Sequence, residues 1–106
     1  ESSPIVLPEQ FTLKQNYPNP FNPRTIIEYD IPYSSRGLEQ IPTSLVIYDL
    51  LGKEVISLVD GNLSPGTYSV SWTGVNNNGN KVASGIYFYS LRTGTFSDTR
   101  RMILLR

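Results

Sequence analysis

The sequence contains no cysteine and no histidine among its 106 residues. Without cysteine, disulfides and thiolate metal sites are excluded. Without histidine, the chain lacks both the commonest general base and the commonest metal ligand. No apolar run approaches the length needed to cross a bilayer, so no membrane span is predicted. These absences remove many kinds of catalytic and metal-binding protein.

Charged residues are scarce and balanced. They make up 17% of the chain, and nine basic residues against nine acidic ones give a formal net charge of zero. This balance favours neither nucleic acid nor an anionic membrane as a partner. The apolar fraction of 39% is that of an ordinary globular protein, and the length fits one domain with one core.

The first ten residues differ from the rest. Residues 1–10 contain Pro4 and Pro8 and show little periodicity, so we expect a linker there and a folded domain over residues 11–106. The chain begins at Glu1 with no charged-then-apolar leader. We therefore expect a piece cut from a longer protein, or a processed product.

Alternation of apolar and polar residues is the main pattern in the domain. In residues 25–31, Ile27, Tyr29 and Ile31 share one face and Glu28 and Asp30 the other, as in a half-buried strand. Short strands at regular spacing and no helix are typical of an all-β protein, an antiparallel β-sandwich. We expect about seven strands, at residues 11–14, 25–31, 43–50, 53–59, 67–72, 85–91 and 96–105.

Glycine and asparagine mark the connections between these strands. Gly52 is the natural place for a positive φ angle in the turn that begins at Asp49. Residues 60–66 are a second turn cluster, and residues 33–42 a longer loop. Residues 76–80 predict a tight hairpin loop around an Asn-Gly pair.

The stretch NYPNPFNP holds three prolines and three asparagines. Prolines remove backbone donors and push the preceding residues toward extended geometry, so this stretch is neither helix nor central strand. We expect a stiff crossing between the first two strands, acting either as a brace that keeps the linker exposed or simply as a rigid corner. The predicted N-terminal brace motif is Tyr17, Pro18, Asn19, Pro20, Phe21, Asn22 and Pro23.

Catalytic chemistry is poorly supported, so we expect no enzyme and no cofactor. Serine and threonine hydroxyls abound, but no histidine can activate them. Lys14, Lys53 and Lys81 stand in turn or solvent-facing contexts. Glu28 and Asp30 are paired carboxylates, but they share the expected solvent face of a strand rather than flanking a cleft.

The asparagine loop is a weak metal candidate. Asn76, Asn78 and Asn80 offer oxygen donors at alternate positions, loosely like a calcium loop. No acidic residue lies between Asp60 and Asp98, and calcium sites rely on carboxylates. A hairpin turn is therefore the favoured interpretation, and no metal is predicted.

The aromatic residues leave carbohydrate binding open as an alternative function. Tyrosine supplies seven of them, and β-sandwiches can bind glycans on flat aromatic strips. The candidates for exposure are Tyr17, Phe21, Tyr33, Tyr48 and Phe88. The aromatics that fit the inward pattern, and are expected in the core with their polar ends bonded at the sheet edge, are Tyr68, Trp72, Tyr87 and Tyr89.

The sequence ends on DTRRMILLR, which is both basic and apolar. From Arg92 onward, four arginines accompany a single acid, Asp98. The simplest interpretation is a final strand whose arginines, Arg100 and Arg101 among them, are solvated. A terminal strand can also offer a free edge that another protein pairs with by strand addition.

Several short motifs follow one another along the chain. They are the brace motif, Tyr48-Asp49 with Gly52 and Val55, Pro65-Gly66-Thr67-Tyr68, Trp72, Ala83-Ser84-Gly85-Ile86-Tyr87 and Arg101-Met102-Ile103-Leu104-Leu105-Arg106. In this combination and order they resemble the type A C-terminal sorting domain of type IX secretion cargo, which is itself similar to the immunoglobulin-like domain of the flagellar hook-capping protein. The resemblance covers about residues 11–106. Thr73 departs from it, since an acid usually follows the tryptophan, and residues 34–41 are longer than the expected turn.

The resemblance implies an immunoglobulin-like β-sandwich that acts as a non-catalytic sorting signal. Such domains direct attached cargo through the type IX outer-membrane translocon of Bacteroidota and related bacteria. A sortase-like protease often removes the domain afterwards and attaches the cargo to the cell surface. The implied partners are the translocon, that protease and a cargo domain upstream in the same chain. The implied location is secreted or cell-surface, reached through the periplasm and outer membrane.

We predict that the translocon recognises the C-terminal hairpin. Its arginines would supply charge, and the residues between them would supply apolar contacts. A passive immunoglobulin-like spacer of a surface protein is the other alternative to a sorting role. The predicted recognition residues are Gly85, Tyr87, Arg100, Arg101, Met102, Ile103, Leu104, Leu105 and Arg106, of which Gly85 and Tyr87 are expected to be mostly core.

Overall fold

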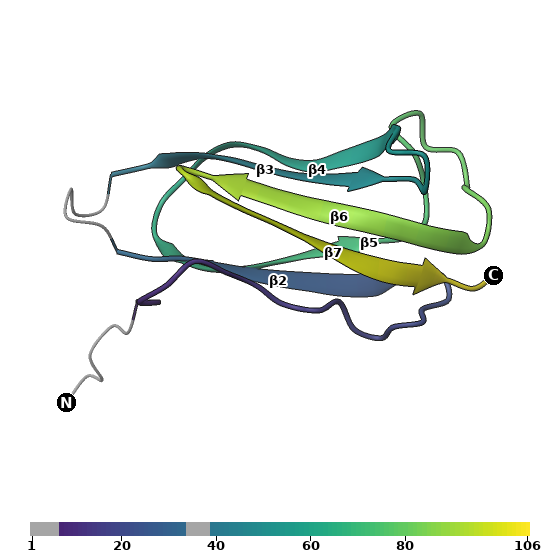
Figure 1. Cartoon of the computed structure of the whole chain (residues 1–106), viewed down its shortest axis with the longest axis horizontal. Helices are drawn as coiled ribbons and strands as arrows, with labels where there is room; N and C mark the ends of the chain where they lie inside the picture. The colour runs from purple at the N-terminus through teal and green to yellow at the C-terminus, as the bar shows by residue number, and fades with distance from the viewer. Residues whose placement is uncertain (1–6, 34–38) are drawn as a thin grey trace.

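The structure is a computed structural model that describes residues 7–33 and 39–106. The strands in this part of the chain form two antiparallel sheets. One sheet has the strand order β1-β2-β5 and the other β4-β3-β6-β7 (Figure 1). In this part of the chain no helix is long and apolar enough to cross a membrane. The strands are β1 Thr12–Leu13, β2 Thr25–Ile31, β3 Ile41–Tyr48, β4 Glu54–Leu63, β5 Gly66–Trp72, β6 Gly85–Thr93 and β7 Phe96–Leu104.

The predicted all-β sandwich is confirmed. Most strand bounds differ from the prediction by one or two residues, and the largest difference is in β4. β4 runs on to Leu63, through residues that the sequence assigned to a turn. The start of β3 pairs with this extension, with Ile41 opposite Leu63 and Thr43 opposite Gly61. Ladder hydrogen bonds to β3 outweigh the low strand propensity of glycine and asparagine there. The predicted long loop falls partly on residues 34–38, which lie outside the described residues, as do residues 1–6 of the predicted linker.

The core lies between the sheets and follows the predicted alternation. In β2 every second residue is buried, and β3 and β6 repeat the pattern. Burying these apolar side chains supplies the main driving force for folding. The buried apolar residues are Leu13, Phe21, Ile27, Tyr29, Ile31, Leu45, Ile47, Val55, Trp72, Tyr87, Tyr89, Leu91, Met102 and Leu104.

The four aromatics predicted to point inward, Tyr68, Trp72, Tyr87 and Tyr89, each find a partner for their polar end. Trp72 Nε1 donates to the carbonyl of Val75 at 2.8 Å, and the Tyr87 hydroxyl donates to the carbonyl of Ala83 at 2.7 Å. Tyr68 is only half-buried, and its hydroxyl donates to a backbone carbonyl four residues earlier. Within the described chain no buried side-chain polar atom lacks a partner, as expected of a well-packed core.

Tyr29 makes the core sensitive to high pH. Burial and the neighbouring Tyr68 raise the pKa of Tyr29 to about 12, whereas tyrosine in an unfolded chain ionises near pH 10. Between these values the unfolded chain loses its proton while the folded chain keeps it, so stability falls as the pH rises from about 10 to about 12.

We predict that Tyr29→Phe reduces this loss of stability. Phenylalanine keeps the stacked ring contact with Tyr68, at 5.5 Å between centroids, but cannot ionise. Urea unfolding of the variant and the parent should be compared at pH 8 and at pH values between 10 and 12. The prediction is contradicted if both proteins lose the same free energy of unfolding over this range.

Candidate functional site

The two motifs that the sequence singled out lie against each other. Phe21 of the brace motif forms a parallel bridge with Leu104. The N–H of Phe21 donates to the carbonyl of Ile103 at 3.0 Å, and the N–H of Leu105 donates to the carbonyl of Phe21 at 2.9 Å. The amide oxygen of Asn19 accepts from the N–H of Ile103 at 3.0 Å. We call residues 13–21 the crossing segment and these contacts the seam.

Phe21 is buried, although the sequence placed it among exposed aromatics. It is 2% exposed, and its ring lies 5.7 Å from that of Trp72. The seam fixes the backbone on both sides of Phe21, and its ring is held against the core. The proline-rich stretch has no alternation of apolar and polar residues, so nothing in its pattern indicated that the Phe21 ring points into the core. The other residues of the brace motif are exposed, and the peptide bonds before Pro18, Pro20 and Pro23 are cis.

The start of the crossing segment joins the two sheets. The Tyr89 hydroxyl donates to the carbonyl of Lys14 at 2.7 Å and accepts from the N–H of Asn16 at 2.8 Å. Arg100 Nε donates to the carbonyl of Leu13 at 2.6 Å. Gln15 Nε2 donates to the carbonyl of Arg101 at 2.8 Å. Residues of β6 and β7 therefore hold the chain that leads from β1 to β2.

Several predicted recognition residues belong to the core. Tyr87 is 7% exposed, and Met102 and Leu104 are fully buried. Gly85 is half-buried and pairs with Leu104 in the ladder between β6 and β7. Such residues support the fold and are not available to a docking partner while the domain is folded.

The predicted arginines are in three different situations. Arg100 is half-buried, bonded to Leu13 and 3.9 Å from a carboxylate oxygen of Asp98. Arg101 is exposed, and only its backbone carbonyl is bonded to the crossing segment. Arg106 is exposed but anchored. Of the predicted set, Arg101, Leu105 and Arg106 are exposed, and Arg100 and Ile103 are partly exposed.

Arg106 closes the fold on the loop between β5 and β6. Its N–H donates to the Ser84 hydroxyl at 2.8 Å, and its Nε donates to the carbonyl of Val82 at 2.6 Å. A terminal guanidinium nitrogen of Arg106 donates to the carbonyl of Gly74. Figure 1 shows the end of β7 at the same end of the sandwich as this loop and the β3–β4 turn.

The seam also covers the C-terminal half of the outer edge of β7, the terminal strand that the sequence analysis expected to offer a free edge. β7 is an edge strand, yet its outward backbone groups at Ile103 and Leu105 bond to the crossing segment. A shallow hollow of about 360 Å³ remains beside the crossing segment, lined by residues that include Asn19, Thr99 and Arg101. Strand addition to the C-terminal half of β7 would therefore require the crossing segment to leave.

The asparagine loop is the tight turn that the sequence favoured. The Asn76 side-chain oxygen accepts from the N–H groups of Asn78 and Asn80, both at 3.0 Å. The Asn77 side chain bonds to Glu54 at 3.1 Å and to the N–H of Ser57 at 3.2 Å. The donor atom of the weak calcium candidate at Asn76 is thus engaged by the loop's own backbone.

The remaining aromatic candidates lie in two places. Tyr17 and Tyr33 are exposed, by 53% and 57%. Tyr48 and Phe88 are half-buried, and the sheet register sets them directly opposite each other on β3 and β6. These two aromatics alone, of those proposed for glycan binding, form a pair across neighbouring strands.

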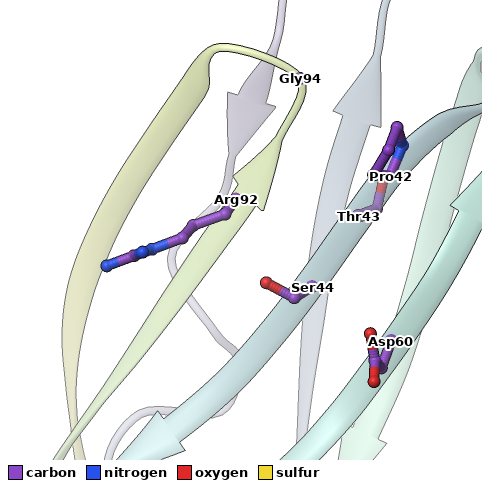
Figure 2. Close-up of a pocket in the computed structure, with 6 residues that line it drawn as sticks. All are labelled: Pro42, Thr43, Ser44, Asp60, Arg92 and Gly94. Carbon is purple, nitrogen blue, oxygen red and sulfur yellow. The ribbon is translucent and has the colours of Figure 1, made fainter.

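A shallow polar hollow of about 350 Å³ lies at the other end of the larger sheet. Ser44 stands between Arg92 of β6 and Asp60 of β4 in the ladder, and Figure 2 shows their side chains on the three strands. Sequence reasoning missed this row, because it placed Asp60 in a turn rather than at the extension of β4.

The fold and its sequence place the chain in a known class, the immunoglobulin-like β-sandwiches. The pattern of the FlgD Ig-like domain matches residues 38–95, which is more than half of the chain. The chain therefore belongs to the FlgD Ig-like domain family. No curated protein matches it in sequence.

Two solved structures from Porphyromonas gingivalis share this fold over 91% of the chain. PorZ, described as an essential bacterial surface component of the type-IX secretion system, has a TM-score of 0.57 and 21% identity. Dimeric latent PorU has a TM-score of 0.65 and 18% identity. The chain spans 11% of the PorZ chain and 9% of the PorU chain. The family match and the shared fold confirm the predicted immunoglobulin-like domain and its similarity to that of the flagellar hook-capping protein.

We predict that Tyr89→Phe loosens the crossing segment. The change leaves the buried N–H of Asn16 without its acceptor and the carbonyl of Lys14 without its donor. Unsatisfied buried groups cost about 1–3 kcal/mol, so the free energy of unfolding in urea should fall by that amount. Tyr33→Phe is the matched control, since this exposed tyrosine should change stability by less than about 0.5 kcal/mol. Equal stabilities of the two variants would contradict the role of Tyr89.

We predict that Gly74→Ala displaces Arg106. Gly74 has a φ of +74°, and a Cβ there would lie 2.6 Å from a guanidinium nitrogen of Arg106. Gly79 is the matched control, because its φ of +80° carries the same backbone penalty with nothing within 4 Å. Each substitution should cost about 1–2 kcal/mol for the left-handed backbone.

Gly74→Ala should cost at least about 1 kcal/mol more than Gly79→Ala, because it also breaks a bond of Arg106. Urea unfolding followed by Trp72 fluorescence measures both. If the two variants are equally stable, Arg106 does not stabilise the loop.

Proposed function

We propose that this domain is a non-catalytic sorting signal that directs attached cargo through a type IX outer-membrane translocon. The observation that carries the proposal is the fold shared, over 91% of the chain, with PorZ, a surface component of the type-IX secretion system. The motifs of type A sorting domains support it, and two of them, around Phe21 and Ile103, meet in the seam.

The proposed partners are the translocon, a cargo domain upstream in the same chain and a sortase-like protease that cleaves before the domain. The cargo would then be secreted or held at the cell surface. The end of the chain supports recognition of a folded domain, because Met102, Leu104 and Arg106 are built into the core or anchored. A translocon would read side chains that the fold holds in place, rather than a loose peptide tail.

Two other functions remain candidates. A glycan-binding module is favoured by one observation, the facing pair of Tyr48 and Phe88, although burial of Phe21 removes one of its predicted aromatics. A passive spacer is favoured by membership of the FlgD Ig-like domain family, where the fold itself carries no specific activity.

We predict that residues 1–106 suffice to export a reporter. The domain should be fused behind a leader peptide and a fluorescent protein, in a bacterium with a type IX system, and fluorescence measured outside the cells. Truncating the end of β7 is an unsuitable control, since it removes the buried Met102 and Leu104 and should unfold the domain.

The matched controls are the reporter alone and the reporter fused to an unrelated immunoglobulin-like domain of similar size. Both should remain in the periplasm, whereas the full fusion should appear outside. Export of neither fusion would contradict a sorting role and support a spacer, whereas export of both would show that the signal lies outside this domain.

A further inference from the structure

The outer faces of the two sheets differ in chemistry. The outward residues of β2 and β5 are mostly polar: Glu28, Asp30, Thr67, Ser69 and Ser71 alternate with the buried positions. This is the usual arrangement when one face of an antiparallel sheet is solvated. The outer face of the larger sheet lacks this polar character at one of its ends.

At the end of the larger sheet that carries the C-terminus, the outward residues are apolar. Tyr48 stands opposite Phe88, and Ile86 stands opposite Ile103. The turn that follows β3 adds two leucines beside them. We call this surface the apolar end-face, formed by Tyr48, Leu50, Leu51, Ile86, Phe88 and Ile103.

The apolar end-face is exposed and hollowed. Leu51 is 93% exposed, Leu50 64% and Ile86 36%. These three residues line one hollow of about 310 Å³, whose other lining residues are Asp49, Ser84, Gly85 and Tyr87. Single exposed leucines need no explanation, but apolar side chains gathered around a hollow mark an interaction surface.

Arg101 supplies a positive charge at this surface. It stands opposite Phe88 in the ladder and is exposed. Among the described residues, no acidic side chain forms an ion pair with it. Asp49, which lines the hollow, keeps its charge, and its Oδ1 is held in place by the N–H groups of Leu51 and Lys53. An acidic group on a partner would therefore find its counter-charge at Arg101.

We infer that the apolar end-face is where the sorting domain is recognised, and that its occupant is a protein segment with an apolar side chain beside a carboxylate. The inference rests on the proposed sorting function and names the surface that serves it. The apolar side chain fills the hollow at Leu51 and Ile86. The carboxylate pairs with Arg101, which lies on the neighbouring strand β7, opposite the residue two positions from Ile86.

A protein segment fits this surface better than a glycan or a second copy. A sugar needs several polar side chains for its hydroxyl groups, whereas four of the six residues of the apolar end-face are aliphatic: Leu50, Leu51, Ile86 and Ile103. A second copy would bring its own Arg101 and Asp49, so its charges would match this surface less well than a segment that carries a carboxylate alone. Buried aromatic and arginine contacts typically dominate protein interfaces.

The inference also gives Arg101 and Ile103 a role in recognition, and this role leaves the seam intact. Arg101 and Ile103 project outward from β7 while Met102 and Leu104 are buried between the sheets. The seam and the Arg106 anchor hold this strand in place. The end of the chain thus contributes to recognition through side chains on a sheet face, with its backbone edge already paired.

The reporter fusion tests the inference. We expect Leu51→Asp and Arg101→Glu each to lower the exported fraction by about tenfold, as for residues central to an interface. Arg101→Lys should restore most export, because the charge is kept. The matched controls are Arg92→Glu, on the polar half of the same face, and Tyr33→Asp, an exposed aromatic outside the end-face; both should be exported like the parent.

Urea unfolding of the purified domains checks that each variant is folded, which is expected because Leu51 and Arg101 are exposed. Export of the parent together with both end-face variants would overturn this inference and leave the sorting function standing. Failure of the parent itself would overturn both. A dimer in sedimentation that Leu51→Asp dissolves, or polysaccharide binding lost in the same variant, would assign the surface to another occupant and also overturn it.

Discussion

The pairing of the crossing segment with the end of β7 is the constraint on which the rest of the structure depends. Two packed sheets bury their inner faces, but the space between β2 and β7 would stay open at one end. Phe21 fills it with an aromatic ring beside Trp72, and its backbone pairs with Ile103 and Leu105. The prolines around Phe21 restrict the unfolded chain, so less conformational entropy is lost when the segment is fixed.

This pairing divides the last residues of the chain by direction. Side chains of β7 that point between the sheets complete the core. The backbone groups at the outer edge of its C-terminal half are hydrogen-bonded by the crossing segment. The outward side chains of this part of β7 remain in contact with solvent. Natural proteins commonly protect an edge strand from unwanted pairing, and here a proline-rich segment does so. A partner of the folded domain is thereby directed to side-chain chemistry at Arg101 and Ile103, on the sheet face.

The local alternation of residues was sufficient to predict most strands, but it could not predict the contacts between segments that are far apart in the sequence. Alternation in residues 25–31 and 67–72 predicted β2 and nearly all of β5. The extension of β4 could not be predicted, because Gly61 and Asn62 favour a turn locally and become strand only by pairing with β3. The burial of Phe21 and the anchoring of Arg106 likewise depend on segments more than 20 residues away, which no short pattern encodes.

The inward positions of such a sandwich are demanded by the fold, so they say little about what the domain does. The outward positions are free to be polar, as they mostly are on β2 and β5. Where outward residues stay apolar, as at Tyr48, Phe88 and Ile103, burial between the sheets does not explain them, which is why the proposed binding surface is placed there. Members of one immunoglobulin-like family can therefore share a core and differ in function through a single face. In this chain that face includes the strand that the seam secures.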